Sequence, residues 1–236
     1  MNASCILLLA VTAGLSGCAI DRVSYPVRHE TRTIERDTSE TARVNLEMGA
    51  GDLHVAGGAQ DLVQADFNYN VPSLRPELHY HTFAGRAEVT IRQRATGDFH
   101  RFASTTKYGW DLRLNNEIPM DFKLHFGAGE AHLNLASLNL RGVEVEMGVG
   151  KIQVDLRGTP KRDYEVRIRG GIGEATLYLP QDAGISAKAQ GGLGQVEVVG
   201  LRKDNGHWVN ALWDSGKPQV RVDVEGGIGQ IRLIAE

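Results

Sequence analysis

The segment VEVEMGVGKIQVD, residues 143–155, contains the pattern that decides the fold. Val143 and Val145 alternate with glutamates, as expected for a strand with one buried face. After the glycine element at 148–150 the apolar positions are Ile152 and Val154, so odd positions give way to even ones. Such a slip turns apolar side chains outward unless the backbone forms a bulge or corner. The segment therefore predicts a strand, a glycine corner and a second strand.

The same element occurs six times. Its glycine pairs are Gly49 and Gly51, Gly127 and Gly129, Gly148 and Gly150, Gly171 and Gly173, Gly192 and Gly194, and Gly227 and Gly229. In the four middle copies the first glycines are 21, 23 and 21 residues apart. We expect the second glycine to have a positive φ and to allow close backbone approach. The residue between the glycines is always Ala, Val, Ile or Leu, and we expect it to point into the core.

Repeats of this length cannot cover their own apolar face, so they must stack on one another. The sequence predicts an all-β fold over 41–236, as a single-stranded β-helix (β-solenoid) or two-sheeted stack of two-strand repeats with glycine corners. Two stretches interrupt the repeats. We interpret the region about 63–120 as an N-terminal capping hairpin region, and the surplus at 201–218 as a long loop of the kind that often binds partners.

The first 17 residues contain no Asp, Glu, Lys or Arg and include an apolar run at 6–11. That run is too short to span a bilayer and is typical of a signal peptide. Leu15-Ser16-Gly17-Cys18 resembles the bacterial lipobox, which implies cleavage before Cys18 and a lipid on its thiol. Cys5 would be discarded with the signal peptide. The alternative is an ordinary signal peptide whose cleavage site lies near a free cysteine.

Residues 18–40 are polar, apart from a few apolar side chains, and are interpreted as the lipidated cysteine followed by a tether. The expected partner is the membrane, through the lipid anchor. Ala19 follows the cysteine, and resemblance to Gram-negative lipoproteins then implies the outer membrane. The 26 Lys and Arg are interspersed with 29 Asp and Glu, so no basic footprint favours nucleic acid as a partner.

The chain from about 38 to 236 resembles the bacterial toast-rack proteins, which are related to the LiaF-like C-terminal domain and to adhesins of the same repeat type. The resemblance rests on Met48 to Leu53, Asn68 to Pro72, Trp110 to Asn115, Phe126 to Ala131 and Glu225 to Ile231. It implies a β-helix and a non-catalytic envelope role. LiaF-like members are linked to cell-wall stress sensing, in which the domain works beside membrane helices.

No motif predicts catalysis, a metal or a cofactor. A strand follows each glycine pair, whereas a phosphate-binding loop requires a helix there. His79 and His81 share a strand face, and His125 and His132 bracket a corner, but no cysteine or carboxylate cluster completes a metal site. No serine or cysteine lies in a recognisable nucleophile motif.

The tryptophans Trp110, Trp208 and Trp213 have two interpretations. On exposed loops they could contact a glycan or a protein, as tryptophans do at interaction hot spots. Folded back, they would cap the ends of the stack, which every repeat protein needs. We list Trp208 and Trp213 as possible partner contacts.

The first functional hypothesis is a non-enzymatic, lipid-anchored envelope protein: a scaffold, an adhesin-like module or a stress-related binding module. Its partner would be another envelope protein or a glycan. The alternative is an envelope carbohydrate-active β-helix enzyme or a polysaccharide-binding lipoprotein. An enzyme requires a cleft with converging charged side chains, whereas a scaffold requires only strand ladders.

Overall fold

The computed structural model describes residues 26–94 and 107–236, so the predicted signal peptide, Cys18 and the segment 95–106 lie outside the described residues. The described chain is all β, with one short 3-10 helix, η1, at Pro72–Leu74. No helix in the described ranges has the length and apolarity needed to cross a membrane. The strands are β1 Arg28–Ile34, β2 Thr41–Ala59, β3 Val63–Tyr69, β4 Pro76–Phe83, β5 Arg86–Gln93, β6 Tyr108–Asn115, β7 Met120–Asn134, β8 Leu140–Asp155, β9 Tyr164–Tyr178, β10 Gly184–Val199, β11 Arg202–Asp204, β12 His207–Val209 and β13 Gln219–Ile234.

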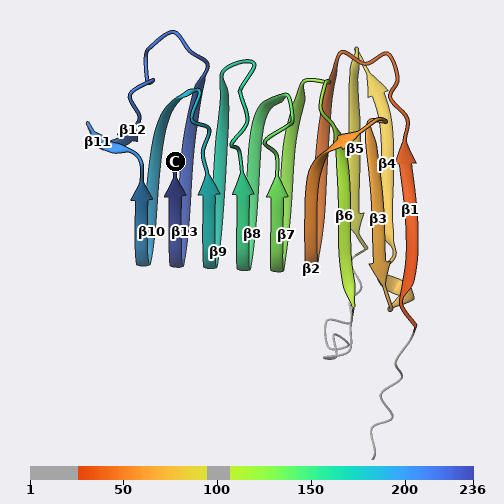
Figure 1. The fold of residues 1–236 in the computed structure, drawn as a ribbon. Helices are drawn as coiled ribbons and strands as arrows, with labels where there is room; N and C mark the ends of the chain where they lie inside the picture. The colour runs from red at the N-terminus through yellow and green to blue at the C-terminus, as the bar shows by residue number, and fades with distance from the viewer. Residues whose placement is uncertain (1–25, 95–106) are drawn as a thin grey trace, which may run out of the picture.

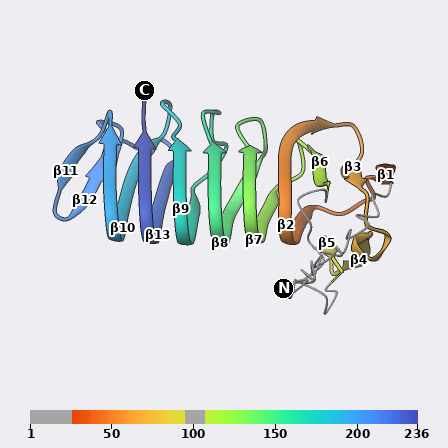
Figure 2. The ribbon, with the colours of Figure 1, turned by 90° about the horizontal axis from the view of Figure 1, so that it is seen from below.

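The strands form one large mixed sheet that is not closed. Six long strands, in the order β2-β7-β8-β9-β13-β10, run parallel with their glycine corners in register. Figure 1 shows them side by side, and Figure 2 views the same strands from the edge that carries the corners. We call this edge the corner edge.

Each long strand contributes to two layers that enclose the core. In β8, Val143 and Val145 are buried before the corner, and Ile152 and Val154 are buried after it. The inward positions thus change from odd to even across the corner, and the same slip occurs in β9 and β13. Both halves of a strand therefore direct their apolar side chains into one core.

The corner backbones pack too closely for side chains. The second glycine of all six copies has a φ between +128° and +145°. A Cβ added to Gly150 would lie 2.0 Å from the carbonyl oxygen of Gly129 in the neighbouring strand. The first glycine is constrained as well, because a Cβ on Gly148 would lie 2.4 Å from the carbonyl oxygen of Gly127. Stacking of corner on corner thus excludes a side chain at both positions.

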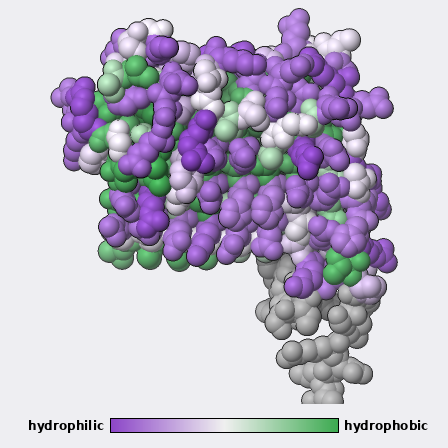
Figure 3. Space-filling view, viewed as in Figure 1, coloured by the Kyte–Doolittle hydropathy of each residue, from purple (hydrophilic) through white to green (hydrophobic). Residues whose placement is uncertain are grey.

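The expectation that the residue between the glycines points into the core is wrong. Val149, Ile172 and Ile228 are each about half exposed, and Leu193 is 70% exposed. In the space-filling view, apolar residues line the lower edge beneath the long strands (Figure 3). The corner crosses from one layer to the other, so its middle residue faces away from both.

At the N-terminal end of the stack, two short strands, β5 and β6, take the position of one long strand beside β2. β5 pairs with Thr41–Glu47 of β2, and β6 pairs with Asp52–Ala59. Beside the corner of β2, the Gln93 side-chain oxygen accepts hydrogen bonds from the backbone N–H groups of Gly49 and Ala50, at 2.6 and 3.0 Å. Gln93 thereby accepts from the backbone N–H groups of the β2 corner, which a further stacked corner would otherwise pair with.

Further strands extend this end of the sheet. β3 pairs with β6, β1 pairs with β3, and β4 pairs with β5. The predicted tether, 18–40, is therefore not a tether throughout, because Arg28–Ile34 forms β1. The polar composition of this segment gave no strand pattern, because both faces of a strand at the sheet edge can remain partly exposed to solvent.

At the C-terminal end the strands do not stack in chain order, since β13 lies between β9 and β10. The segment 201–218 connects β10 to β13, and its length allows β13 to lie between β9 and β10. It contains the short strands β11 and β12, and β12 pairs with the start of β10 through Trp208 and Val209.

Candidate functional site

The outward side chains on the first halves of the long strands form a charged surface. They alternate with buried Val, Leu and Ile residues, so the strand period alone directs them to solvent. We call this surface the charged face; it includes Arg43, Glu47, Asp121, Lys123, His125, Glu144, Glu146, Glu165, Arg167, Arg169, Arg221, Asp223 and Glu225.

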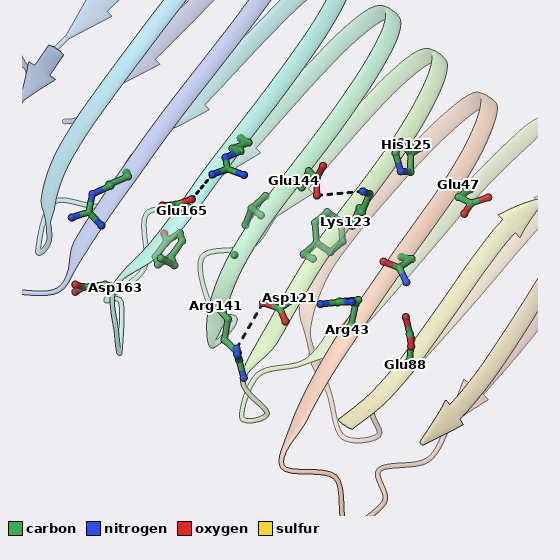
Figure 4. A pocket seen from close by; sticks show the side chains of 17 residues that line it. Arg43, Glu47, Glu88, Asp121, Lys123, His125, Arg141, Glu144, Asp163 and Glu165 are labelled. Atoms are coloured by element: carbon green, nitrogen blue, oxygen red, sulfur yellow. Dashed lines mark hydrogen bonds and ion pairs between the residues drawn. The ribbon is translucent and has the colours of Figure 1, made fainter. Parts of the chain in front are cut away.

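Ion pairs link neighbouring strands across the charged face. Lys123 Nζ lies 3.3 Å from Glu144 Oε2, and Arg169 Nε lies 3.6 Å from Glu225 Oε2. Arg141 approaches Asp121 at 3.7 Å (Figure 4). These side chains are about 30–60% exposed, so each pair adds at most about 1 kcal/mol to stability. The charged face is thus held together only weakly by its ion pairs, and its charges remain largely in contact with solvent.

Two adjoining hollows lie on the charged face. The first, of about 750 Å³, extends over β2, β7, β8 and β9, and its lining is shown in Figure 4. The second, of about 520 Å³, lies between β9, β13 and the segment 204–214. Glu165, Arg167 and Arg221 line both, so the hollows are continuous, and we call them together the charged trough.

The two predicted contact tryptophans occupy different places. Trp213 lines the second hollow, and the Arg221 guanidinium lies 5.7 Å from the centre of its ring. Trp208 packs partly against the core at the end of the stack, with Lys203 Nζ at 5.7 Å. Trp213 is therefore part of the trough lining, whereas Trp208 covers the end of the core.

The trough holds no arrangement that resembles a known catalytic group among the described residues. Ser186 Oγ lies 3.4 Å from His207 Nδ1, but within the described chain no carboxylate is hydrogen-bonded to that ring. A catalytic serine requires a base that is itself oriented by a third group. The described segments also contain no group of three or more His, Cys, Asp or Glu residues able to hold a metal ion.

Of the two histidine pairs, His125 and His132 separate in the structure, whereas His79 and His81 remain two residues apart on β4. His125 Nδ1 lies 2.9 Å from Glu146 on the charged face, whereas His132 is on the opposite layer, where its ring stacks on that of His54 at 5.1 Å. His81 lies 3.0 Å from Glu88, and His79 is near Glu77. Each histidine thus has its own carboxylate or ring partner.

The sequence predicted outward charges on the strands but not their assembly into one trough, and it gave no indication of the buried asparagines. Asn115 is 3% exposed; its Nδ2 donates to the carbonyls of Ala59, Gln60 and Asp61, and its Oδ1 accepts from the backbone of Glu117 and Ile118. This side chain joins two turns at the end of the sheet opposite the corner edge. The strand pattern of β6 gives no sign of this burial, because Asn115 follows the inward Leu114 at a position that the alternation assigns to solvent.

Comparison with known proteins places the chain in a family. The family model described as the N-terminal domain of toast_rack, DUF2154, matches residues 23–178. A search of curated proteins gave no match. A crystal structure of a "putative cell adhesion protein" from Clostridium sporogenes ATCC 15579 is 31% identical, with a TM-score of 0.86 over 89% of this chain and 99% of that chain.

A second solved structure is much less similar. The "putative adhesin" BF0245 from Bacteroides fragilis NCTC 9343 is 10% identical and has a TM-score of 0.33, with 89% of this chain and 98% of that chain covered. The family model, in contrast, covers more than half of the chain, and its residues include the corners of β2, β7, β8 and β9. The chain therefore belongs to the toast_rack family.

Proposed function

We propose that this protein is a non-enzymatic, lipid-anchored envelope protein that acts as an adhesin-like binding module. The observation that carries the proposal is the charged trough, a shallow surface of both charge signs with Trp213 at its side. The resemblance to the Clostridium cell adhesion protein supports the same role. In this proposal Cys18 holds the protein on the membrane, in the outer membrane of a Gram-negative host, and the fold is a β-solenoid of the toast-rack type.

The partner is proposed to be an envelope protein or a glycan. Arg and Glu side chains that are about half exposed can exchange their present ion pairs for contacts to a partner. Trp213 and Arg221 add a planar ring and a planar guanidinium, which contribute strongly to many interfaces. A carbohydrate-active enzyme gains less support, since carboxylates of the trough are next to cations instead of one another.

Replacement of Cys18 tests the anchor. We expect Cys18→Ser to abolish incorporation of labelled fatty acid and to move the protein out of the lipidated membrane fraction, because two or more acyl chains are needed for stable anchoring. Cys5→Ser is the matched control and should behave as the parent. Membrane fractionation with metabolic labelling measures both. If Cys18→Ser carries lipid as the parent does, the anchor is wrong.

Charge reversal in the trough tests the binding surface. Arg221→Glu should reduce retention of protein-coated beads on envelope polysaccharide or on envelope-protein surfaces about tenfold, as loss of a central interface arginine does. Arg232→Glu is the matched control, since Arg232 is exposed on the same strand but on the opposite layer, paired with Glu197. Equal losses in both variants, or a parent that is retained on neither surface, contradict the proposed role.

A further inference from the structure

The residues between the paired glycines form an exposed apolar line, which we call the apolar ridge: Ala50, Ala128, Val149, Ile172, Ile228 and Leu193, in spatial order. Neighbouring strands are about 4.8 Å apart, so the ridge extends about 24 Å along the corner edge. Glycines flank every member, and the ridge side chains therefore project beyond the backbone without cover from adjacent side chains.

The fold itself does not explain why the ridge is apolar. The large members are half exposed or more and add little to the core. Of the eight large hydrophobic residues that are exposed in the described chain, four belong to the ridge: Val149, Ile172, Leu193 and Ile228. Outward positions on the adjacent strand halves are mostly charged or polar. A contiguous exposed apolar feature bordered by polar residues marks a contact with something outside the chain.

The N-terminal strand β1 begins at the corner edge of the sheet. Arg28, the first residue of β1, is in register with Tyr69, which pairs with Tyr108. The Tyr108 carbonyl lies at the corner of β2, 2.4 Å from where a Cβ of Gly51 would be. β1 then runs away from this edge (Figure 1). β1 therefore begins on the side of the sheet that carries the apolar ridge.

Contacts of Glu30 hold this entry point in place. Its carboxylate accepts two hydrogen bonds from the Arg75 guanidinium, at 2.8 and 3.0 Å, and one from Tyr69 Oη at 2.9 Å. The Arg75 hydrogen bonds are the main cause that lowers the pKa of Glu30 to about 2. Glu30 is thus ionised at neutral pH, and β1 is tied to both β3 and the segment after it.

The length of chain between Cys18 and the sheet is short. The eight steps from Cys18 to Pro26 span at most about 28 Å, at about 3.5 Å per residue. To bring the opposite edge to a membrane, these residues would have to pass back along the seven residues of β1, about 23 Å. A lipid on Cys18 therefore reaches the corner edge directly, whereas it would reach the opposite edge only with residues 18–26 almost fully extended.

We infer that the corner edge lies on a lipid surface, with the apolar ridge in the boundary between headgroups and acyl chains; this inference rests on the proposed anchoring through Cys18. The anchor acts at the β1 end of the sheet, and the larger ridge residues lie at the β10 end. Two separated attachments hold the stack parallel to the membrane and leave the charged trough open at the side.

The charges beside the ridge specify the kind of lipid. The nearest outward residues are mostly acidic on both layers: Glu47, Glu146, Glu225, Asp52, Glu130 and Glu174, against Arg169 and Lys151. Acidic side chains are repelled by anionic lipid surfaces. The ridge thus fits zwitterionic headgroups, and its contact is apolar in origin.

The test uses the lipidated full chain in phosphatidylcholine vesicles, with or without bromine on the acyl chains, because bromine quenches nearby indole fluorescence. Ile228→Trp places an indole on the ridge, at a half-exposed position. Thr159→Trp is the matched control, on the exposed turn between β8 and β9 at the opposite edge. Circular dichroism melts establish that both variants fold as the parent does.

After the fluorescence of the parent is subtracted, we expect brominated lipid to reduce the indole fluorescence of Ile228→Trp about twofold. Interfacial residues enter the bilayer by about 5–10 Å, which brings the indole close to the bromine atoms. The Thr159→Trp signal should be unchanged. Equal quenching in both variants overturns the inference, as does absence of quenching in Ile228→Trp. Disulfide-linked dimers of Ile172→Cys together with an unquenched Ile228→Trp would assign the ridge to a second copy instead.

The two proposals fail in different ways. A parent chain that does not float with the vesicles contradicts the anchor, and the ridge inference with it. A chain that floats with the vesicles but has an unquenched ridge indole contradicts only the ridge inference.

Discussion

Gly150→Ala should lower the free energy of unfolding by at least about 3 kcal/mol, because two separate costs coincide at this residue. Gly150 has a φ of +134°, which L residues rarely adopt. Its added methyl would also lie 2.0 Å from the Gly129 carbonyl oxygen, and backbone on both sides limits relaxation. For a domain of this size the loss corresponds to a fall of about 6–12 °C in melting temperature. Chemical denaturation and thermal melts measure it.

Gly142→Ala is the matched control in the same strand, β8. A Cβ at Gly142 would have its nearest contact at 3.8 Å, an ordinary van der Waals distance, and no positive φ opposes it. Since alanine restricts the unfolded chain more than glycine does, we expect this variant to be unchanged or about 0.4–1 kcal/mol more stable. If Gly150→Ala were as stable as Gly142→Ala, the close stacking of the corners would be wrong.

The sequence was sufficient to predict the corners because their pattern is local. The period-two alternation and its change of phase around each glycine pair identify which side chains face inward on each half of a strand. The direction of the residue between the glycines is different. It depends on how the backbone crosses between layers, and apolar identity alone wrongly placed Val149 and Ile172 in the core.

Long-range pairing explains the other differences. The position of β13 between β9 and β10 depends on contacts between segments far apart in sequence, which no local pattern specifies. β1 was hidden for the same reason, because its partner β3 begins about thirty residues later and its own composition is polar.

The trough was only partly predictable. The outward charges followed from strand periodicity, and 201–218 was singled out by its length. The contact between these charges and the segment 201–218 was not predictable, because residues of β9 and β13 lie beside Trp213 only in the folded chain. Trp208 and Trp213 lie five residues apart in the same segment, yet one packs on the core and the other lines the trough.

Trp110→Ala should destabilise the protein by about 3–5 kcal/mol, the usual cost of removing a fully buried aromatic side chain. Trp110 was grouped with two loop tryptophans in the sequence, but it is 1% exposed and lies in β6, between β2 and β3. Its ring meets that of Phe67 edge to face at 5.5 Å and that of Tyr108 at 6.0 Å. The side chain therefore joins the regular stack to the N-terminal strands.

The loss should be centred on those N-terminal strands. Amide hydrogen exchange should increase in β1, β3 and β6 more than in β8 and β9, because the cavity opens beside the first group only. Trp213→Ala is the control, since Trp213 is only partly buried, and it should cost less than about 1 kcal/mol. Uniform exchange changes along the whole stack would contradict a local role for Trp110. A selective loosening would mean that the Trp110 ring stabilises the packing of β3, the strand with which β1 pairs, against the regular stack.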